Sequence, residues 1–368
     1  MSEETTSDLQ SLPLVLGVDL GGTQIRVAVL QGAKLLARAS FPTGANPVPN
    51  RIISHIHHVI QQVLDQADAR LDQVAGIGIG VAGPLDNRTG VVFAPPNLPG
   101  WDHVPLRDIF KEHYGIPIFI ENDANAAGLG EYMFGAGRGC KDIVYLTVST
   151  GIGGGVIIDG KIMQGASGTA AELGHMTIDL KGERCNCGNI GCLESIASGT
   201  AIARRANEAM ALGVEFLALT SNKPERNATL LDRSEVPSQE CDTASEPKQQ
   251  LLIDAKAVAQ AAEAGVPAAC VIIRDAAEGL GVGLVNIIHI FNPEMIILGG
   301  GVAQMGFLLM EPALRMVQER TMRISYKAVR IVQAQLGIDA GLIGAGALIY
   351  CNMEESRFLQ REEAIVSL

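Results

Sequence analysis

The sequence lacks the features that mark a membrane, secreted or nucleic-acid-binding protein. Its longest uncharged apolar runs, such as 282–288 and 295–303, are far shorter than the roughly 20 residues that a membrane-spanning helix needs. Positive charge is scarce: 28 Lys and Arg stand against 40 Asp and Glu, and the net charge of −12 opposes nonspecific binding to nucleic acid or to an anionic membrane. The N-terminus has no basic region followed by an apolar core, as a secretory signal would have. We therefore expect a cytoplasmic protein without nucleic-acid or membrane partners.

Cysteine usage argues against disulfides. The seven cysteines are an odd number, and four of them lie scattered along the chain, at Cys140, Cys241, Cys270 and Cys351. A reducing cytoplasm, which the absent secretory signal favours, keeps such thiols free.

The other three cysteines lie in one segment with a histidine. Residues 172–194 read E-L-G-H, nine further residues, and then C-N-C-G-N-I-G-C-L-E. One imidazole and three thiolates are the ligand set of a closed tetrahedral zinc site, which leaves no position for a catalytic water. The four ligands would be His175, Cys185, Cys187 and Cys192, with tight turns at Gly188 and Gly191. The sequence therefore predicts a structural Zn²⁺ that shapes this loop and does no chemistry itself.

The chain is long and apolar enough for two domains, with 368 residues of which 47% are hydrophobic. Residues 14–30 read as a buried strand, a turn at Gly21-Gly22 and a returning strand, and residues 143–158 repeat this order with a glycine turn at 149–155. Strand-like and helix-like segments alternate around these two stretches, which predicts mixed sheets flanked by helices. We expect an α/β fold with two similar lobes and a cleft between them.

The limits of the other elements follow from hydrophobic spacing. Helices are predicted at 51–69, 105–114, 123–134, 199–210, 255–263, 268–290 and about 342–353, and further strands at 74–81, 116–120 and 294–298. Residues 1–12 are mostly polar and are expected to be disordered. The segment from about 213 to 252 places Pro224, Pro237 and Pro247 among polar residues, so we expect a mobile insertion, although its leucines leave a packed helical hairpin open.

Two glycine patterns fail the tests of the nucleotide-binding motifs that they match in part. The G-x-G-x-x-G at 78–83 follows a strand, but Pro84 comes next and no helix begins there to receive a pyrophosphate. The segment 155–161 nearly spells a P-loop, but Ile162 stands where a Mg²⁺-binding Ser or Thr is needed. We expect neither pattern to bind a nucleotide.

The two glycine turns are better candidates for phosphate contact. Asp19 ends the first strand, and its carboxylate can hold Mg²⁺ directly or through water. The residues that follow, Gly21, Gly22 and Thr23, have little bulk and let backbone N–H groups face an anion. Ser149-Thr150-Gly151 can do the same from the opposite lobe. Each turn alone could be an ordinary tight hairpin, but together they favour a clamp for a nucleoside triphosphate.

Glu121-Asn122-Asp123 stands between a strand and an alanine-rich helix. An Asp in this place is a good helix N-cap. It could equally be a carboxylate in the cleft that deprotonates a sugar hydroxyl, with Asn122 binding a neighbouring hydroxyl. Spacing leaves both alternatives open. Asn97, in a proline-rich stretch, is open in the same way between a turn residue and a ligand contact.

Several motifs follow one another along the chain: Asp19-Leu-Gly-Gly-Thr, Glu121-Asn-Asp, Ser149-Thr-Gly-Ile-Gly-Gly-Gly, Glu172-Leu-Gly-His, the knuckle from Cys185 to Glu194, and Leu298-Gly-Gly-Gly-Val. Together they resemble the ROK family of repressors, open reading frames and kinases, and are most similar to its bacterial glucokinases. The resemblance runs from about residue 14 to 350, and its cysteine knuckle is highly specific. It implies the two-lobed, actin-like and ribonuclease H-like sugar kinase fold.

The resemblance also implies a reaction, the ATP-dependent phosphorylation of glucose at its 6-hydroxyl, with Asp123 as the catalytic base. It implies that the other hydroxyls are held by Asn97, Asn122, Glu172, His175 and Glu194, and that the backbone near Gly83 closes the site. The ATP phosphates would meet Gly21, Gly22, Thr23, Thr150 and Gly151, and the adenosine side Gly300 and Gly301. Zinc would then fix a loop whose Glu172 and Glu194 must face the sugar, and His175 could bind zinc with one ring nitrogen and sugar with the other.

Alternatives remain within the resemblance. N-acetylmannosamine, fructose or mannose could replace glucose, because fold and motif underdetermine the substrate, and polyphosphate could replace ATP. A transcription regulator of the family would carry a helix-turn-helix domain before the first glycine turn, where only about a dozen residues precede Leu14. The insertion near 213–252 departs from the family. We expect a small lobe of residues 13–123 plus 340–368, a large lobe of 124–339 with the zinc knuckle at 175–192, and a homo-oligomer, either dimer or tetramer.

Overall fold

The computed structural model describes residues 12–44, 48–95, 98–214, 216 and 253–366, and side chains as far as Met353. Asn97, the N-terminal residues 1–11 and nearly all of the insertion lie outside the described residues. None of the described helices combines the length and the apolar character that crossing a membrane requires.

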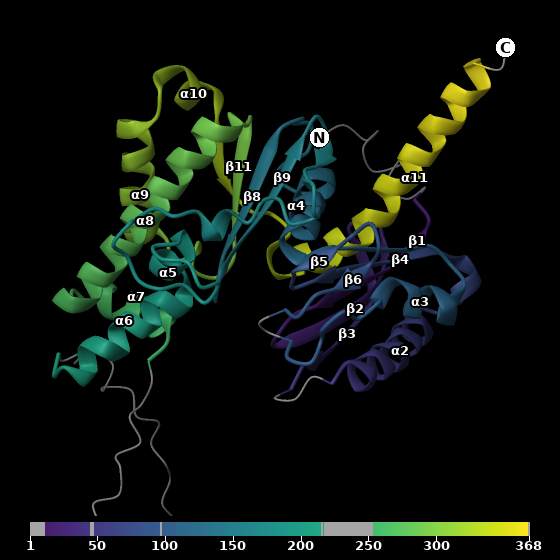
Figure 1. Ribbon diagram of the computed structural model, residues 1–368, viewed down its shortest axis with the longest axis horizontal. Coiled ribbons are helices and arrows are strands. Elements are labelled where there is room, and N and C mark those ends of the chain that lie inside the picture. The colour runs from purple at the N-terminus through teal and green to yellow at the C-terminus, as the bar shows by residue number, and fades with distance from the viewer. Residues whose placement is uncertain (1–11, 45–47, 96–97, 215, 217–252, 367–368) are drawn as a thin grey trace, which may run out of the picture.

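Two five-stranded sheets share one strand order and one pattern of directions. The first runs β3 (Lys34–Pro42), β2 (Gln24–Gln31), β1 (Leu14–Leu20), β4 (Val74–Val81) and β7 (Ile118–Asn122). The second runs β10 (Lys161–Ile162), β9 (Ile152–Ile158), β8 (Ile143–Val148), β11 (Met295–Gly299) and β12 (Arg330–Gln333). In each sheet the middle strand pairs antiparallel with a hairpin on one side and parallel with a later strand on the other. The repeated strand and turn order of the sequence therefore begins two matching sheets (Figure 1).

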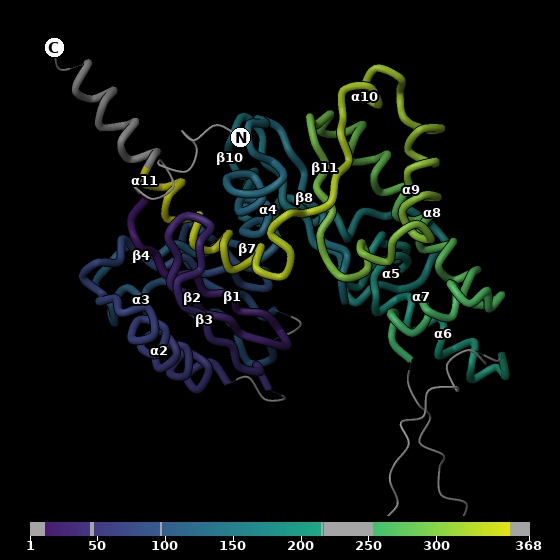
Figure 2. Tube along the Cα trace, turned by 180° about the vertical axis from the view of Figure 1, so that it is seen from behind, coloured from purple at the N-terminus to yellow at the C-terminus, as the bar shows by residue number. Residues whose placement is uncertain are grey.

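Helices lie on both faces of each sheet. The first sheet is covered by α2 (Pro49–Gln66) and α3 (Leu106–Tyr114) on one face and by α11 (Ala340–Val366) on the other. Between the sheets, α11 packs against α4 (Asp123–Phe134), which covers the second sheet (Figure 2). The far side of the second sheet carries α5 (Leu193–Ala197), α6 (Gly199–Ala211), α7 (Ala255–Glu263), α8 (Pro267–Phe291), α9 (Phe307–Arg320) and α10 (Arg323–Ala328). Two separate apolar clusters, one per sheet, form the main cores.

Glycine allows α11 to lie directly on its neighbours. A Cβ at Gly78 of β4 would overlap the carbonyl of Ala345, and one at Gly344 would overlap the carbonyl of Ala126 in α4. The G-x-G-x-x-G pattern at 78–83 is thus explained by close packing of a helix on a strand. As the sequence predicted, no helix follows it: the chain continues into the short hairpin β5 (Leu85–Asp86) and β6 (Val91–Val92).

The second glycine turn is shorter than the sequence predicted. Only residues 149–151 turn, and β9 already begins at Ile152, so that Gly153, Gly154 and Gly155 lie within the strand. Their lack of side chains serves packing: a Cβ at Gly154 would lie 2.6 Å from the Leu173 side chain, and one at Gly155 would lie 2.8 Å from the carbonyl of Ala124. Strands β3 and β12 and helices α9 and α10 were not predicted, and each has exposed positions that weaken its hydrophobic pattern.

Candidate active site

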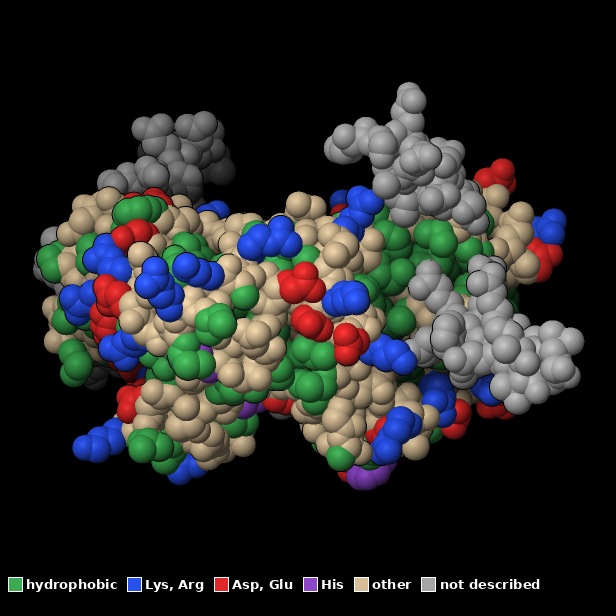
Figure 3. All heavy atoms as spheres, turned by 90° about the horizontal axis from the view of Figure 1, so that it is seen from above, with side chains coloured by type: hydrophobic (Ala, Val, Ile, Leu, Met, Phe, Trp, Pro, Cys, Tyr) green, Lys and Arg blue, Asp and Glu red, His purple; other side chains and the backbone are tan. Residues whose placement is uncertain are grey.

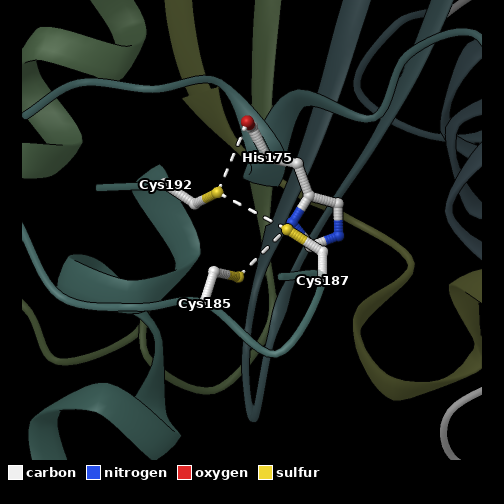
Figure 4. Close-up of side chains that lie close together, drawn as sticks. All are labelled: His175, Cys185, Cys187 and Cys192. Atoms are coloured by element: carbon white, nitrogen blue, oxygen red, sulfur yellow. Dashed lines mark hydrogen bonds between the residues drawn. The ribbon is translucent and has the colours of Figure 1, made fainter. Parts of the chain in front are cut away.

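The four predicted metal ligands converge. His175 ends a short 3₁₀ helix (Leu173–His175), and Cys185, Cys187 and Cys192 lie on the loop before α5. All four ligand atoms lie within 4.8 Å of one another, with Cys187 Sγ 3.7 Å from Cys192 Sγ and His175 Nδ1 3.6 Å from Cys185 Sγ (Figure 4). Tetrahedral zinc with Zn–S bonds of about 2.3 Å places its sulfurs about 3.8 Å apart. The arrangement therefore fits a zinc ion bound by three sulfurs and Nδ1.

Tight turns separate these ligands, as predicted. Gly188 and Gly191 have φ angles of +93° and +69°, which favour glycine because a Cβ would clash with the backbone. A Cβ at Gly191 would also overlap the carbonyl of Asp179. The loop can therefore keep this path only with glycine at that position.

The other ring nitrogen of His175 lies on the side of the predicted sugar ligands. His175 Nε2 is 3.9 Å from Glu172 Oε2, so the imidazole stands between the cysteines and this carboxylate. Burial raises the pKa of Glu172, opposed by His175 and reinforced by repulsion from Glu194. The structure thus brings Glu172, His175 and Glu194 together at the edge of the knuckle.

Asn122, not Asp123, is the N-cap of α4. Its Oδ1 accepts hydrogen bonds from the N–H groups of Ala124 at 2.9 Å and Asn125 at 3.2 Å. Asp123 is the first residue of the helix, and its Oδ1 accepts from the Ala124 N–H at 2.8 Å. A Cβ built on Gly83 would lie 3.1 Å from Asn122 Nδ2, so the predicted Gly83 backbone borders this pair. The capping role is filled by Asn122, which leaves chemistry as a role for Asp123.

Burial and like charges change the proton affinity of Asp123. Loss of water raises its pKa to about 7, and repulsion from Asp19 and Glu172 acts in the same direction. The bond from the Ala124 N–H opposes this rise. A carboxylate that titrates near neutral pH is suited to act as a general base.

Asp19 lies at the end of β1, beside the first glycine turn. Burial raises its pKa, and Arg26, directly opposite on β2, lowers it with a guanidinium nitrogen 3.7 Å from Asp19 Oδ2. The turn itself is tied to Thr43, whose hydroxyl donates to the Gly21 carbonyl at 2.7 Å and whose N–H donates to the Thr23 carbonyl at 3.0 Å. Gly22 is half-buried and Thr23 is exposed.

The second turn is held from behind by the start of α6. The N–H of Gly199 donates to the Ser149 carbonyl at 2.7 Å, and the hydroxyl of Thr200 donates to the Thr150 carbonyl at 2.6 Å. In a trans peptide the C=O and the following N–H point in opposite directions. The N–H groups of Thr150 and Gly151 therefore point away from α6, and successive N–H groups with one orientation suit an anion.

A cleft of about 790 Å³ opens beside this turn. Thr150 and Gly301 both line it, with the first turn of α6 and one side of α7, so the structure brings these two predicted residues together. Gly300 does not line it. Its φ is +87° and a Cβ there would overlap the Val148 carbonyl, so Gly300 instead lets the chain turn against β8.

On the face seen in Figure 3, acidic and basic side chains are intermixed among the described residues.

Glu194 joins the knuckle to the second turn, a contact that spacing did not predict. Its Oε2 accepts the Ile152 N–H at 2.8 Å, and its Oε1 lies 3.8 Å from Cys185 Sγ. A Cβ at Gly151 would stand 2.5 Å from the same Oε2. The carboxylate predicted to hold sugar therefore also fixes the turn predicted to hold phosphate.

Glu121 was missed by the sequence analysis as a functional residue. It is 1% exposed and accepts hydrogen bonds from side chains or backbone of Asn87, Asn122, Asn125 and Gln164. A carboxylate that ends an otherwise apolar strand, directly before Asn122 and Asp123, was the available signal.

Two matching mixed sheets, each opening on a glycine hairpin and separated by packed helices, form the actin-like sugar kinase fold. The chain belongs to the ROK family, whose profile matches residues 15–351. It is 36% identical over 336 residues to the glucokinase of Thermotoga maritima, covering 91% of this chain and 96% of that protein. It is 31% identical over 344 residues to the xylose repressor of Caldicellulosiruptor bescii, covering 92% of this chain and 78% of the repressor.

A solved structure shares the same architecture. The ROK family glucokinase from Streptomyces griseus, in complex with glucose and AMPPNP, matches with a TM-score of 0.70 and 34% identity, covering 91% of this chain and 98% of that one.

Proposed function

We propose that this chain is an ATP-dependent hexose kinase that transfers the terminal phosphoryl group of ATP to the 6-hydroxyl of glucose. The observation that carries the proposal is the position of Asp123 at the start of α4, near Asp19 and Glu172, whose charges add to the effect of burial and raise its pKa to about 7. The glucokinase relatives, and the S. griseus enzyme that binds glucose and AMPPNP, support glucose and ATP as the substrates.

In the proposed reaction, Asp123 accepts the proton of the sugar 6-hydroxyl. The hydroxyl oxygen of the sugar bonds to the terminal phosphorus of ATP, while the bond from that phosphorus to the oxygen of the leaving ADP breaks. The two glycine turns receive the phosphates from opposite sides, through residues 21–23 and through Thr150 and Gly151. The other hydroxyls are held by Asn122, Glu172, His175 and Glu194, with the Gly83 backbone at the edge of the site. The proposed contact of Asn97 concerns a residue outside the described part of the chain.

Two metal ions belong to the proposal. The Cys₃His set is the proposed holder of a structural zinc, and cysteines that are not joined in disulfides fit the proposed reducing cytoplasm. Asp19 is the proposed holder of Mg²⁺, which neutralises phosphate charge when bound. We assign residues 13–123 with 340–368 to one lobe and 124–339 to the other, and their closure on sugar excludes water from the phosphoryl group.

Xylose repressors also lie among the relatives, so kinase activity and sugar choice need a direct test. The test is a coupled ADP-release assay with glucose, mannose, fructose and N-acetylmannosamine, with ATP or polyphosphate as donor. We expect the highest kcat/KM with glucose and ATP. Comparable rates on N-acetylmannosamine would overturn the substrate and keep the kinase. No sugar-dependent release with any pair would overturn both.

A further inference from the structure

Glu121 is a buried carboxylate whose described hydrogen bonds all come from uncharged N–H donors. Its Oε1 accepts from the Asn122 backbone at 3.0 Å and from Asn125 Nδ2 at 3.1 Å. Its Oε2 accepts from Asn87 Nδ2 at 2.9 Å and from Gln164 Nε2 at 3.1 Å. A charged acceptor makes each of these bonds stronger than a neutral pair would.

The two oxygens serve different parts of the fold. Oε1 holds the start of α4, the segment that carries Asp123. Oε2 holds two loops from distant parts of the sequence: Asn87 follows β5, and Gln164 follows β10 on the segment that leads to Glu172. Glu121 is therefore the one side chain through which these three segments share hydrogen bonds in the described structure.

Helix capping does not account for this arrangement. Asn122 Oδ1 already receives the first N–H groups of α4, so the helix start is satisfied without Glu121. What the carboxylate adds is a fixed place for α4 relative to the loops that carry Asn87 and Gln164. The buried Asn125 amide would cost about 1–3 kcal/mol if it lost this acceptor, so the bonds to Glu121 favour the arrangement in which the three segments stay together.

We propose that Glu121 is a positioning residue that holds the base Asp123 in register with the loop that carries Glu172. The inference rests on the proposed kinase function, because the register matters for a sugar held between these two carboxylates. Catalytic groups displaced by about 1 Å can lose about 100-fold in rate.

The test exchanges the donor and the acceptor of one hydrogen bond, the bond from Asn87 Nδ2 to Glu121 Oε2. Asn87→Asp replaces the donor Nδ2 by a carboxylate oxygen that faces Glu121 Oε2, and two carboxylates at this distance repel. Glu121→Gln in the same chain restores a donor and an acceptor, since the new amide can donate to the carboxylate at position 87 while its oxygen still accepts from Asn122. Glu121→Gln alone should be mild, because the amides of Asn87 and Gln164 can each turn an oxygen toward the new N–H donors: Asn87 Oδ1 is buried without a hydrogen-bond partner in the described structure, and Gln164 is exposed.

We expect Asn87→Asp to lower kcat by about 10-fold or more and to raise the KM for sugar, with the KM for ATP changed less than about twofold. The double variant should return to within about threefold of wild type, a coupling that independent sites do not show. Asn50→Asp is the matched control, because it adds the same charge at an exposed position at the start of α2. Melting temperatures measured in parallel should show the same loss and rescue.

The inference is overturned if Asn87→Asp behaves like Asn50→Asp, or if Glu121→Gln fails to rescue it. It is also overturned if the kcat of Asn87→Asp falls only in proportion to the folded fraction of the protein while both KM values stay unchanged. That result would mean that Glu121 stabilises the fold but does not position Asp123. An inactive wild-type chain would instead overturn the proposed function, and the melting temperatures would still decide whether Glu121 and Asn87 are coupled.

Discussion

At the residue scale, the site gathers carboxylates whose charges are costly. Asp19, Asp123 and Glu172 each have a pKa raised by burial, and repulsion among them adds to the rise at Asp123. Arg26 offsets part of this charge at Asp19. Such a cluster is expected where a base must titrate near neutrality and where phosphate-bound Mg²⁺ arrives with positive charge.

The first prediction concerns the pH dependence of activity. Because Asp123 must be ionised to accept a proton, kcat/KM for sugar should rise with pH up to a midpoint near 7 and then level off. Glu172→Gln removes one repelling charge and should move the midpoint to lower pH, whereas Glu183→Gln, at an exposed side chain, should not. A midpoint near 4 in the wild type would contradict the assignment of Asp123.

The second prediction concerns stability. The pKa of Asp123 rises from 3.8 to about 7 on folding, so the folded state binds more protons than the unfolded state between these values. Stability contributed by this group is therefore lost as pH rises from about 4 to about 7. Asp123→Asn should be more stable than wild type at pH 8, by at most about 4 kcal/mol, with a smaller difference at pH 5. Urea unfolding at the two pH values measures this, and a variant less stable at pH 8 would refute it.

At the scale of elements, the second glycine turn depends on helices that follow it by about fifty residues. The start of α6 holds its carbonyls, and Glu194 at the start of α5 holds the N–H of Ile152. Since the knuckle runs directly into α5, the proposed metal loop and the proposed phosphate turn share one support. A substitution at the start of α5 or α6 is therefore expected to change the affinity for ATP.

The third prediction tests this support. Thr200→Val removes the hydroxyl that donates to the Thr150 carbonyl, a bond worth about 1 kcal/mol. The KM for ATP should rise about 5-fold, while the KM for sugar stays within about twofold. Thr200→Ser keeps the hydroxyl and should behave as wild type. Equal kinetics for the Val and Ser variants would show that the bond does not position the turn.

The fourth prediction concerns the metal. Cys185→Ser should abolish stoichiometric zinc, measured by elemental analysis, and should lower the melting temperature by about 5–10 °C, because metal binding is part of the folding free energy. The KM for sugar should rise as well. Cys270→Ser, at an exposed cysteine, is the control. Zinc-free wild-type protein with full activity would contradict the site.

Spacing along the sequence predicted local features such as hairpins and metal-ligand spacing. It did not predict contacts between residues that lie far apart in the chain. The hairpins at 14–30 and 143–158 and the knuckle ligands were predictable because strand alternation, glycine turns and ligand spacing are short-range. Glu121 was missed because its partners Asn87 and Gln164 come from elsewhere in the chain. Glu194 was assigned to sugar alone because its bond to Ile152 spans 42 positions.

At the scale of the whole molecule, each of the two matching sheets begins with a glycine hairpin, and α4 and α11 pack against each other between the sheets. The proposed reaction holds a phosphoryl group between the two turns, and the proposed base Asp123 lies at the start of α4. The dimer or tetramer expected from the family resemblance stays a prediction, and mass in solution relative to 38.8 kDa per chain would decide it.

The most direct test of the central claim compares wild type with Asp123→Ala in one experiment, measuring ADP release with and without glucose and glucose binding by calorimetry. We predict glucose-dependent release by wild type, a loss of about 1,000-fold or more in the variant, since general-base catalysis contributes 10²–10⁴-fold, and a glucose Kd changed by less than about threefold. A variant that keeps its rate, or a wild type that releases no ADP in response to glucose, would contradict the account.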